Sequence, residues 1–247
     1  MKARNRREDL TFLPHLLTTG NLLSGAASLY FALQGQYVLA GVCIYLGMVM
    51  DVLDGFTAQR LGIATPFGVE YDSLADFLTF GVAPAFLAYR YALAPLAEWG
   101  WVSGAAYMTA TALRLARFNV YGLSAPSDKT YFQGLPSPAA AGVLVGVLAV
   151  LQPPLSRPTT SALALLPCAL GVLMISRVPF PHMQYLYRRM AAVLGPLHLL
   201  GLAVAGILLI FRPRPFLAVL FGGYALLGLL RELMHRLRSQ STSQPKR

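Results

Sequence analysis

Acidic residues and cysteines are scarce in this sequence. Asp and Glu supply 10 of the 247 residues, and the only two cysteines, Cys43 and Cys168, each lie inside an apolar run. So few cysteines provide neither a disulfide framework nor a Cys-rich zinc site, and we expect both to be small buried thiols. Charged residues make up 12% of the chain, hydrophobic residues 56%, and the mean hydropathy is +0.56. This composition argues against ordinary soluble domains and indicates an integral membrane protein.

Positive charge dominates the few charged residues. The formal net charge is +10 at pH 7. A basic chain can bind nucleic acid, but here the basic residues flank apolar runs, which membrane topology and anionic lipid head groups explain better. We therefore expect membrane lipids, and no nucleic acid, as surroundings and partners.

Apolar runs recur along the whole chain, and a helix of ~20 apolar residues crosses a bilayer. Eight candidates cover residues 11–33, 37–59, 69–94, 98–118, 137–153, 160–176, 192–211 and 215–231. The predicted fold is therefore all-α, a polytopic membrane helix bundle of about eight transmembrane helices. We expect a structural role, or the interface of a homodimer, for the last two spans.

Lys and Arg predict the orientation. They cluster before the first span and around the end of the last one: Lys2, Arg4, Arg6, Arg7, Arg231, Arg236, Arg238, Lys246 and Arg247. An even number of spans puts both termini on one side, and the positive-inside rule makes that side cytoplasmic. We expect a cytoplasmic segment (1–10), a domain in the cytoplasmic (inner) membrane (11–232) and a basic, disordered tail (233–247).

Half of the acidic residues are gathered in one short stretch. Between residues 48 and 76 lie Asp51, Asp54, Glu70, Asp72 and Asp76. On helices, spacings of three and four put each Asp pair on one face. Because the connection between the pairs (61–67) is short and contains Gly and Pro, the two helices should be antiparallel neighbours. The pattern predicts a cluster of four carboxylates at the cytoplasmic ends of the second and third spans.

Such a cluster needs protons or cations, since two like charges ~4 Å apart repel by roughly 4 kcal/mol even at an effective dielectric of about 20. Hard oxygen ligands favour Mg²⁺, Mn²⁺ or Ca²⁺ over zinc. We expect one or two divalent ions, Mg²⁺ or Mn²⁺, held by the four aspartates. Gly55 and Ala58 each follow an aspartate by four residues and leave that helix face open, which favours a nucleotide diphosphate as the ligand.

These residues also form a recognisable pattern. Asp51-x-x-Asp54-Gly55-x-x-Ala58, followed by Gly68-x-x-x-Asp72-x-x-x-Asp76, resembles the signature of the CDP-alcohol phosphotransferase family. The family has Arg directly after the Ala, whereas this chain has Gln59 and then Arg60. The resemblance implies a metal-dependent membrane transferase, with a CDP-linked lipid bound by Gly55, Ala58, Gly68 and either Gln59 or Arg60.

Three further strings resemble the phosphatidylserine synthase branch of this family. They are the segment from Pro14 to Asn21, in which His15 replaces an Asn, the string DSLADxxxFGxAP from Asp72, and Arg114-x-x-Arg117-Phe118-Asn119. The branch implies CDP-diacylglycerol and L-serine as substrates, with Asn21 lining the site. In the second string, Gly81 and Pro84 predict a bent or loosened helix beside the site.

Arg114 and Arg117 allow two interpretations. They lie three residues apart, on one helical face, at the depth of the aspartates. They could anchor the helix at the interface by snorkelling. A guanidinium also binds phosphate or carboxylate in bidentate fashion. We favour contact with the lipid phosphate or the serine carboxylate.

The predicted function is transfer of a phosphatidyl group from CDP-diacylglycerol to the hydroxyl of L-serine, giving phosphatidylserine and CMP. Asp76 would be the general base. Glycerol 3-phosphate and inositol phosphate remain open as alternative acceptors. A cation-coupled transporter is the alternative from another class, because intramembrane carboxylates often mark ion paths. The position of the acids at one membrane face and the lack of an obvious inverted repeat argue against it.

Overall fold

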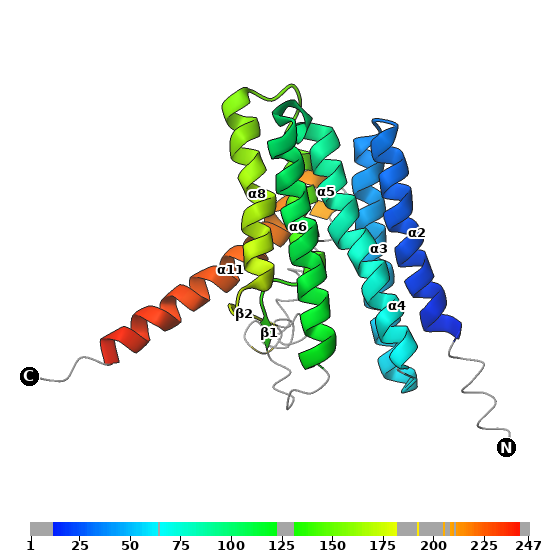
Figure 1. Ribbon diagram of the computed structural model, residues 1–247. Coiled ribbons are helices and arrows are strands. Elements are labelled where there is room, and N and C mark those ends of the chain that lie inside the picture. The colour runs from blue at the N-terminus through cyan, green and yellow to red at the C-terminus, as the bar shows by residue number, and fades with distance from the viewer. Residues whose placement is uncertain are drawn as a thin grey trace, which may run out of the picture.

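The computed structural model describes residues 12–63, 65–122, 131–181 and 211–242, with residues 192, 205, 208 and 209 as isolated positions. Helices dominate the described chain and pack side by side as a bundle, from which α11 runs out obliquely (Figure 1). In chain order the elements are α2 (Phe12–Leu33), α3 (Tyr37–Leu61), α4 (Pro66–Asp76), η1 (Phe77–Val82), α5 (Ala83–Ala88), η2 (Tyr89–Leu93), η3 (Ala94–Leu96), α6 (Glu98–Arg117), η4 (Phe118–Gly122), β1 (Tyr131–Gln133), α7 (Ser137–Val150), α8 (Arg157–Ile175), β2 (Pro179–Pro181) and α11 (Pro213–Thr242).

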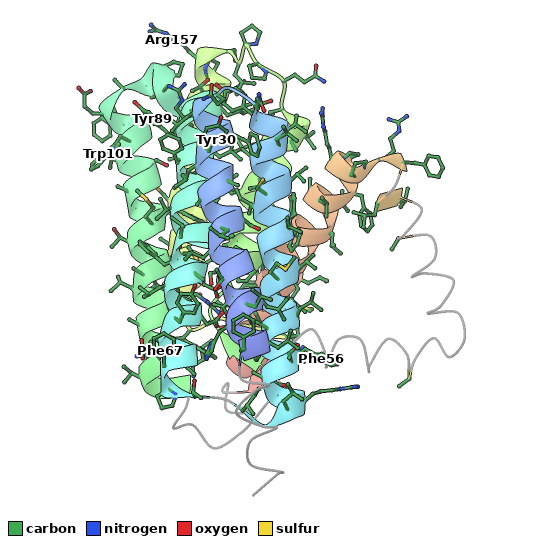
Figure 2. The ribbon with its side chains drawn as sticks, turned by 90° about the vertical axis from the view of Figure 1, so that its right-hand side faces the viewer. Tyr30, Phe56, Phe67, Tyr89, Trp101 and Arg157 are labelled. Carbon is green, nitrogen blue, oxygen red and sulfur yellow. The ribbon has the colours of Figure 1, made fainter. Side chains whose placement is uncertain are left out.

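Five stretches of the described chain are long and apolar enough to cross a membrane. They are Phe12–Leu33, Tyr37–Leu61, Pro66–Leu96, Arg157–Ile175 and Pro213–Met234. Large apolar side chains such as Val52 and Leu165 are more than 60% exposed along them, as expected where lipid is the solvent. Tyr30, Tyr89 and Trp101 lie toward one end of the bundle, and Phe56 and Phe67 toward the other (Figure 2). The protein is therefore a helical integral membrane protein.

The prediction of eight spans is confirmed only in part. α7 has 14 residues and is shorter than a full crossing, and α6 is not among the five because polar residues such as Thr109 and Arg114 interrupt its apolar character. Most of the run 192–211 and the termini, 1–11 and 243–247, lie outside the described residues. The count of eight and the orientation of the termini stay predictions. α11 continues as a helix to Thr242, into the segment 233–247 that was expected to be disordered.

The third span is interrupted, as Gly81 and Pro84 predicted. π-helical turns occupy Phe77–Val82 and Tyr89–Leu93, and Pro84 lies in the first turn of the short α5 between them. A π-turn widens the helix and frequently accompanies a functional site. The first of these turns follows Asp76 directly.

The connection between the two acid-bearing helices is determined by local sequence. α3 ends at Gly62, which adopts the left-handed conformation (φ 63°) and donates its backbone N–H to the carbonyl of Ala58. Thr65 caps α4 by accepting a hydrogen bond from the backbone N–H of Gly68 (3.0 Å), and Pro66 begins the helix. These signals reverse the chain within a few residues.

Two short strands form a ribbon that the sequence did not predict. β1 and β2 are antiparallel, with Phe132 opposite Phe180. Phe180 is fully buried and packs on Tyr224 of α11, with ring centroids 5.9 Å apart. Strands of three residues are too short to show an alternating pattern, and β2 also contains two prolines, so nothing in the sequence distinguishes these strands from loops.

Candidate metal centre

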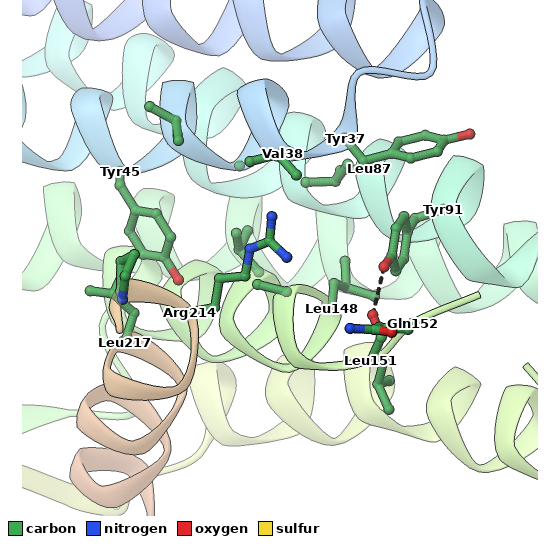
Figure 3. Close-up of a pocket in the computed structure, with 15 residues that line it drawn as sticks. Tyr37, Val38, Tyr45, Leu87, Tyr91, Leu148, Leu151, Gln152, Arg214 and Leu217 are labelled. Atoms are coloured by element: carbon green, nitrogen blue, oxygen red, sulfur yellow. Dashed lines mark hydrogen bonds between the residues drawn. The ribbon is translucent and has the colours of Figure 1, made fainter. Parts of the chain in front are cut away.

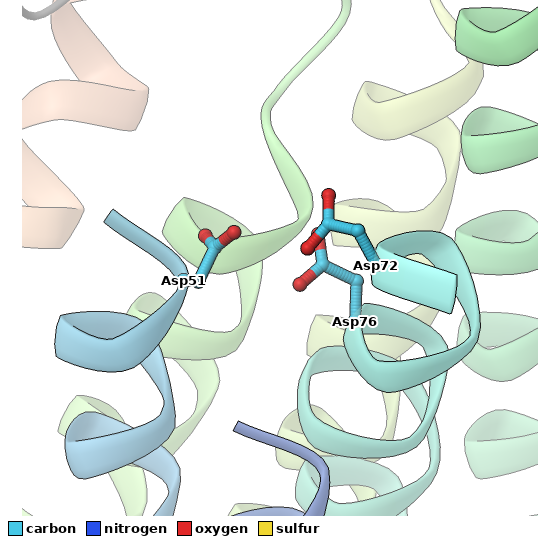
Figure 4. Close-up of side chains that lie close together, drawn as sticks. All are labelled: Asp51, Asp72 and Asp76. Carbon is cyan, nitrogen blue, oxygen red and sulfur yellow. The ribbon is translucent and has the colours of Figure 1, made fainter. Parts of the chain in front are cut away.

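Three of the four predicted aspartates come together at one point. Asp51 of α3 and Asp72 and Asp76 of α4 each place a carboxylate oxygen within 4.8 Å of the other two (Figure 4). The local spacing puts Asp72 and Asp76 on one face of α4. α2 packs against both α3 and α4. The two acid-bearing helices therefore meet with the help of a third helix, to which the sequence analysis gave no such role.

The aspartate trio (Asp51, Asp72 and Asp76) fits a divalent cation. Oδ1 of Asp72 is buried and has no hydrogen-bond partner among the described residues, and Asp76 is only 7% exposed. A buried carboxylate oxygen without a partner is costly unless a cation or donor compensates it. Around one Mg²⁺ at ~2.1 Å, ligand oxygens lie at most about 4.2 Å apart, so small side-chain rotations suffice for all three to share an ion.

Asp54 has a different environment. It is 5% exposed, and its Oδ2 accepts a hydrogen bond from Oγ1 of Thr18 in α2 (2.7 Å). It does not belong to the group of oxygens that lie within 4.8 Å of one another. Metal ligation by Asp54 stays a prediction, and Thr18 is a partner that the sequence analysis did not identify.

Asn21 lies directly beside the trio. It is fully buried, and its Nδ2 donates a hydrogen bond to Oδ1 of Asp76 (3.0 Å). Its backbone carbonyl accepts from Oγ1 of Thr79 (2.9 Å), which anchors this turn of α2 to η1. The side-chain Oδ1 of Asn21 has no partner in the described chain. Asn21 thus orients Asp76.

Two glycines allow α2, α3 and η1 to approach one another here. A β-carbon at Gly47 of α3 would collide with the side chain of Thr79 and with Oδ1 of Asn21. A β-carbon at Gly25 of α2 would collide with Thr79 as well. Larger residues at either position would push the three elements apart and displace Asn21 from Asp76.

The residues expected to bind the CDP-linked lipid lie around the turn between α3 and α4. Gly55 is exposed, and a β-carbon there would meet no atom within 4 Å. Ala58 is half-buried one turn later. The guanidinium of Arg60 lies over the ring of Phe56, 4.7 Å from its centroid. Gly68 is half-buried in the first turn of α4. The open surface expected at Gly55 is therefore present, and contact of these residues with a nucleotide stays a prediction.

An aromatic cluster beside this turn was not expected from the sequence. His15 packs edge-on against Phe67 with ring centroids 5.6 Å apart, and Phe67 stacks on Tyr71 at 5.9 Å. The hydroxyl of Tyr71 shares a hydrogen bond with Thr19 (2.9 Å). The cluster joins the start of α2 to the start of α4, which fixes two of the helices that carry site residues.

The two arginines of α6 have different surroundings. Arg114 is buried, and its Nη1 donates to Oγ of Ser137 (2.8 Å), while its Nε is buried without a partner among the described residues. It can still donate to an anionic ligand. The Nη1 of Arg117 donates to the carbonyl of Ile175 (2.7 Å), and its Nη2 donates to the carbonyl of Gln133 (2.9 Å). Arg117 therefore caps the end of α8 and holds β1, which favours a structural role for it.

Asn119 of η4, which directly follows α6, forms hydrogen bonds with α4. Its Nδ2 donates to Oγ of Ser73 (3.0 Å) and to Oε2 of Glu70 (3.3 Å). Glu70, the fifth acid of the stretch, thus lies outside the aspartate trio and is bound to another partner. Because Ser73 follows Asp72 directly, this contact links the arginine-bearing helix to the trio.

Comparison with known proteins points in one direction. The family model described as CDP-alcohol phosphatidyltransferase matches residues 11–178. A protein of Helicobacter pylori (strain ATCC 700392 / 26695) is 34% identical over 228 residues, which cover 91% of this chain and 92% of that protein. A protein of Bacillus subtilis (strain 168) is 34% identical over 175 residues (71% and 93%), and one of Methanocaldococcus jannaschii is 39% identical over 138 residues (56% and 61%). All three are named CDP-diacylglycerol--serine O-phosphatidyltransferase. The matched family region contains every candidate site residue described above.

Proposed function

Because the chain belongs to the CDP-alcohol phosphatidyltransferase family, we propose that it transfers the phosphatidyl group of CDP-diacylglycerol to L-serine. The products are phosphatidylserine and CMP. The similar proteins of Helicobacter pylori and Bacillus subtilis, which carry the name of this activity, support serine as the acceptor.

One observation supports the reaction centre above all others. The trio gathers three carboxylate oxygens within 4.8 Å, and one of its oxygens, Oδ1 of Asp72, is buried without a hydrogen-bond partner in the described chain. Asp51, Asp72 and Asp76 would hold one or two ions, Mg²⁺ or Mn²⁺, with Asp54 as a further ligand. A bound divalent cation would neutralise the negative charge of the diphosphate and the charge that develops on the departing CMP.

Asp76 takes the proton of the serine hydroxyl in this account. The hydroxyl oxygen forms a bond to the phosphorus of the phosphatidyl group, and the bond from that phosphorus to the CMP oxygen breaks. Asn21 holds the carboxylate of Asp76 in place through its hydrogen bond of 3.0 Å. No covalent enzyme intermediate is needed when both substrates are bound together.

The remaining residues bind and position the substrates. Gly55 and Ala58 leave room for the cytidine nucleotide, with Gly68 and Arg60 at the two ends of the same turn. Arg114 receives the serine carboxylate or the lipid phosphate, because its buried Nε lacks a partner in the described chain. The acyl chains of the donor stay in the bilayer.

We place this site at the cytoplasmic face of the inner membrane, with both termini on the same side, because Lys and Arg cluster before the first span and after the last. A homodimer is the proposed assembly, formed through the last two spans, whose leucine- and glycine-rich sequences suit helix packing in a membrane.

The test is release of CMP from CDP-diacylglycerol by purified protein in detergent with Mg²⁺ or Mn²⁺. L-serine, glycerol 3-phosphate and inositol phosphate are offered as separate acceptors. Serine-dependent release supports the proposal. CMP release with another acceptor would support the transferase reaction but not serine as the acceptor. No release with any of the three acceptors would reject the transferase and favour a cation-coupled transporter in which the trio binds the cation.

A further inference from the structure

A cavity of about 170 Å³ is lined on α3 by residues of the helix's first half, whereas Asp51 of the trio lies in its second half (Figure 3). It is bounded by the first half of α3, by α5 and η2, by the end of α7 and by the first turns of α11. Its walls are mainly apolar and include Val38, Leu87, Leu148 and Leu217. The cavity is smaller than the ~300–1,000 Å³ of pockets that enclose whole small molecules, so it suits a length of hydrocarbon rather than a nucleotide.

Arg214 is the single charged residue among the described residues that line this cavity. In Figure 3 its guanidinium extends from the start of α11 toward α3. The hydroxyls of the three tyrosines that line the cavity already donate to backbone carbonyls: that of Tyr91 to Leu151 (2.6 Å), that of Tyr45 to Gly142 (3.2 Å) and that of Tyr37 to Arg90 (3.3 Å). Among the described residues, no acid lines the cavity to neutralise the arginine. The combination of an apolar cavity and one cation is complementary to an anionic amphiphile.

We propose that this cavity binds a membrane phospholipid with an anionic head group, separately from the substrate lipid. A segment of one acyl chain fills the cavity, and the phosphate lies against Arg214. α11 begins at Pro213, so the positive end of its dipole also favours an anion there. Each basic residue near the membrane surface contributes ~1 kcal/mol to such binding.

The site depends on a helix outside the matched family region. The family model ends at residue 178, whereas Arg214 and Leu217 belong to α11. α11 lies close to α7 because α7 has glycines at the contact: a β-carbon at Gly142 would overlap the ring of Phe221, and one at Gly146 would meet the backbone of Ala218. The cavity therefore forms where α11 packs on the matched family region.

The test measures retained lipid on the full-length protein. Protein is placed in nanodiscs of phosphatidylglycerol and phosphatidylcholine in equal amounts, without CDP-diacylglycerol, then released into mild detergent, and bound lipids are counted by native mass spectrometry. Wild-type protein should retain one phosphatidylglycerol in preference to phosphatidylcholine by roughly fivefold, as one basic residue provides. The variant Arg214→Gln should lose this preference.

Two further variants make the result specific. Arg212→Gln removes an exposed arginine that does not line the cavity, and it should keep the preference of the wild type. Ala149→Leu adds volume inside the cavity and should lower retention of both lipids while Arg214 is intact. Thermal melting in detergent checks that each variant is folded. Equal retention of the two lipids by wild-type protein, or an unchanged preference in Arg214→Gln, overturns the proposal, as does a cavity covered by a second copy with no lipid retained.

Discussion

Asn21 and Asp76, which are 55 residues apart in the sequence, are joined by a hydrogen bond of 3.0 Å from Nδ2 of Asn21 to Oδ1 of Asp76. The bond links α2 to the acid that we assign as general base. It leaves Oδ1 of Asn21 without a partner in the described chain. The geometry of the aspartate trio thus depends on α2, a helix that contributes no acid to it.

Replacement of Asn21 by Ala should reduce kcat. The loss of a hydrogen bond to a charged group costs about 1.5–3 kcal/mol, which corresponds to a rate decrease of roughly 10- to 100-fold. The measurement is the steady-state rate of CMP release. Ser28→Ala is the matched control, since Ser28 is buried on the same helix and its hydroxyl has no hydrogen-bond partner within the described part of the chain. Equal rates in Asn21→Ala and Ser28→Ala would remove Asn21 from the site.

Replacement of Asp76 by Asn should stop turnover but not donor binding. Loss of a general base lowers the rate by about 10²- to 10⁴-fold, while the other aspartates and the nucleotide-binding turn stay in place. CMP release measures the first effect, and thermal stabilisation by added CDP-diacylglycerol measures the second. Glu98→Gln is the control substitution of an acid, because Glu98 begins α6 and Arg114 lies near the other end of that helix. Normal turnover in Asp76→Asn would contradict the assignment of Asp76 as the general base.

Arg114 and Arg117 should respond differently to replacement by Lys. A lysine at position 117 loses the fork that binds the end of α8 and β1, and we expect the free energy of unfolding to fall by about 1–3 kcal/mol, with little change in the serine KM. A lysine at position 114 should raise the KM for serine by roughly tenfold. A raised serine KM with unchanged stability in Arg117→Lys would instead place Arg117 at the substrate, as the sequence analysis favoured.

Substitutions of Gly47 and Gly55, both in α3, should affect different properties: the first the stability of helix packing, the second the binding of the donor substrate. Gly47→Ala forces a methyl group into Thr79 and Asn21, and such overpacking costs about 1–3 kcal/mol of stability. Gly55→Val meets open space and should leave the melting temperature unchanged, but it narrows the face where the nucleotide is proposed to bind, so the KM for CDP-diacylglycerol should rise. An unchanged KM in Gly55→Val argues against the nucleotide at this face.

Local features of the site were predictable from the sequence because they depend on helical spacing. Asp72 and Asp76 share a helix face since they lie four residues apart, and the turn before them follows from Gly62, Thr65 and Pro66. The short connection predicted that the chain reverses and brings Asp51 near this pair, whereas the packing of both helices against α2 was not predicted.

Contacts between distant segments could not be predicted in this way. Thr18 binds Asp54 across 36 residues, and Arg117 binds the carbonyl of Ile175 across 58. Whether an arginine near a helix end binds a ligand or a backbone carbonyl depends on which helix ends next to it, and α8 ends there only in the folded bundle. The ribbon of β1 and β2 could not be predicted either, because no local sequence pattern indicates it.

The most direct test of the central claim is incorporation of labelled L-serine into lipid by purified protein with CDP-diacylglycerol, comparing wild type with Asp72→Asn, each with Mg²⁺ and with EDTA. We predict labelled phosphatidylserine and equimolar CMP from wild type with Mg²⁺, and loss of both with EDTA and in the variant. Label incorporation that persists in Asp72→Asn or in EDTA, or no incorporation by wild type under any condition, contradicts the account.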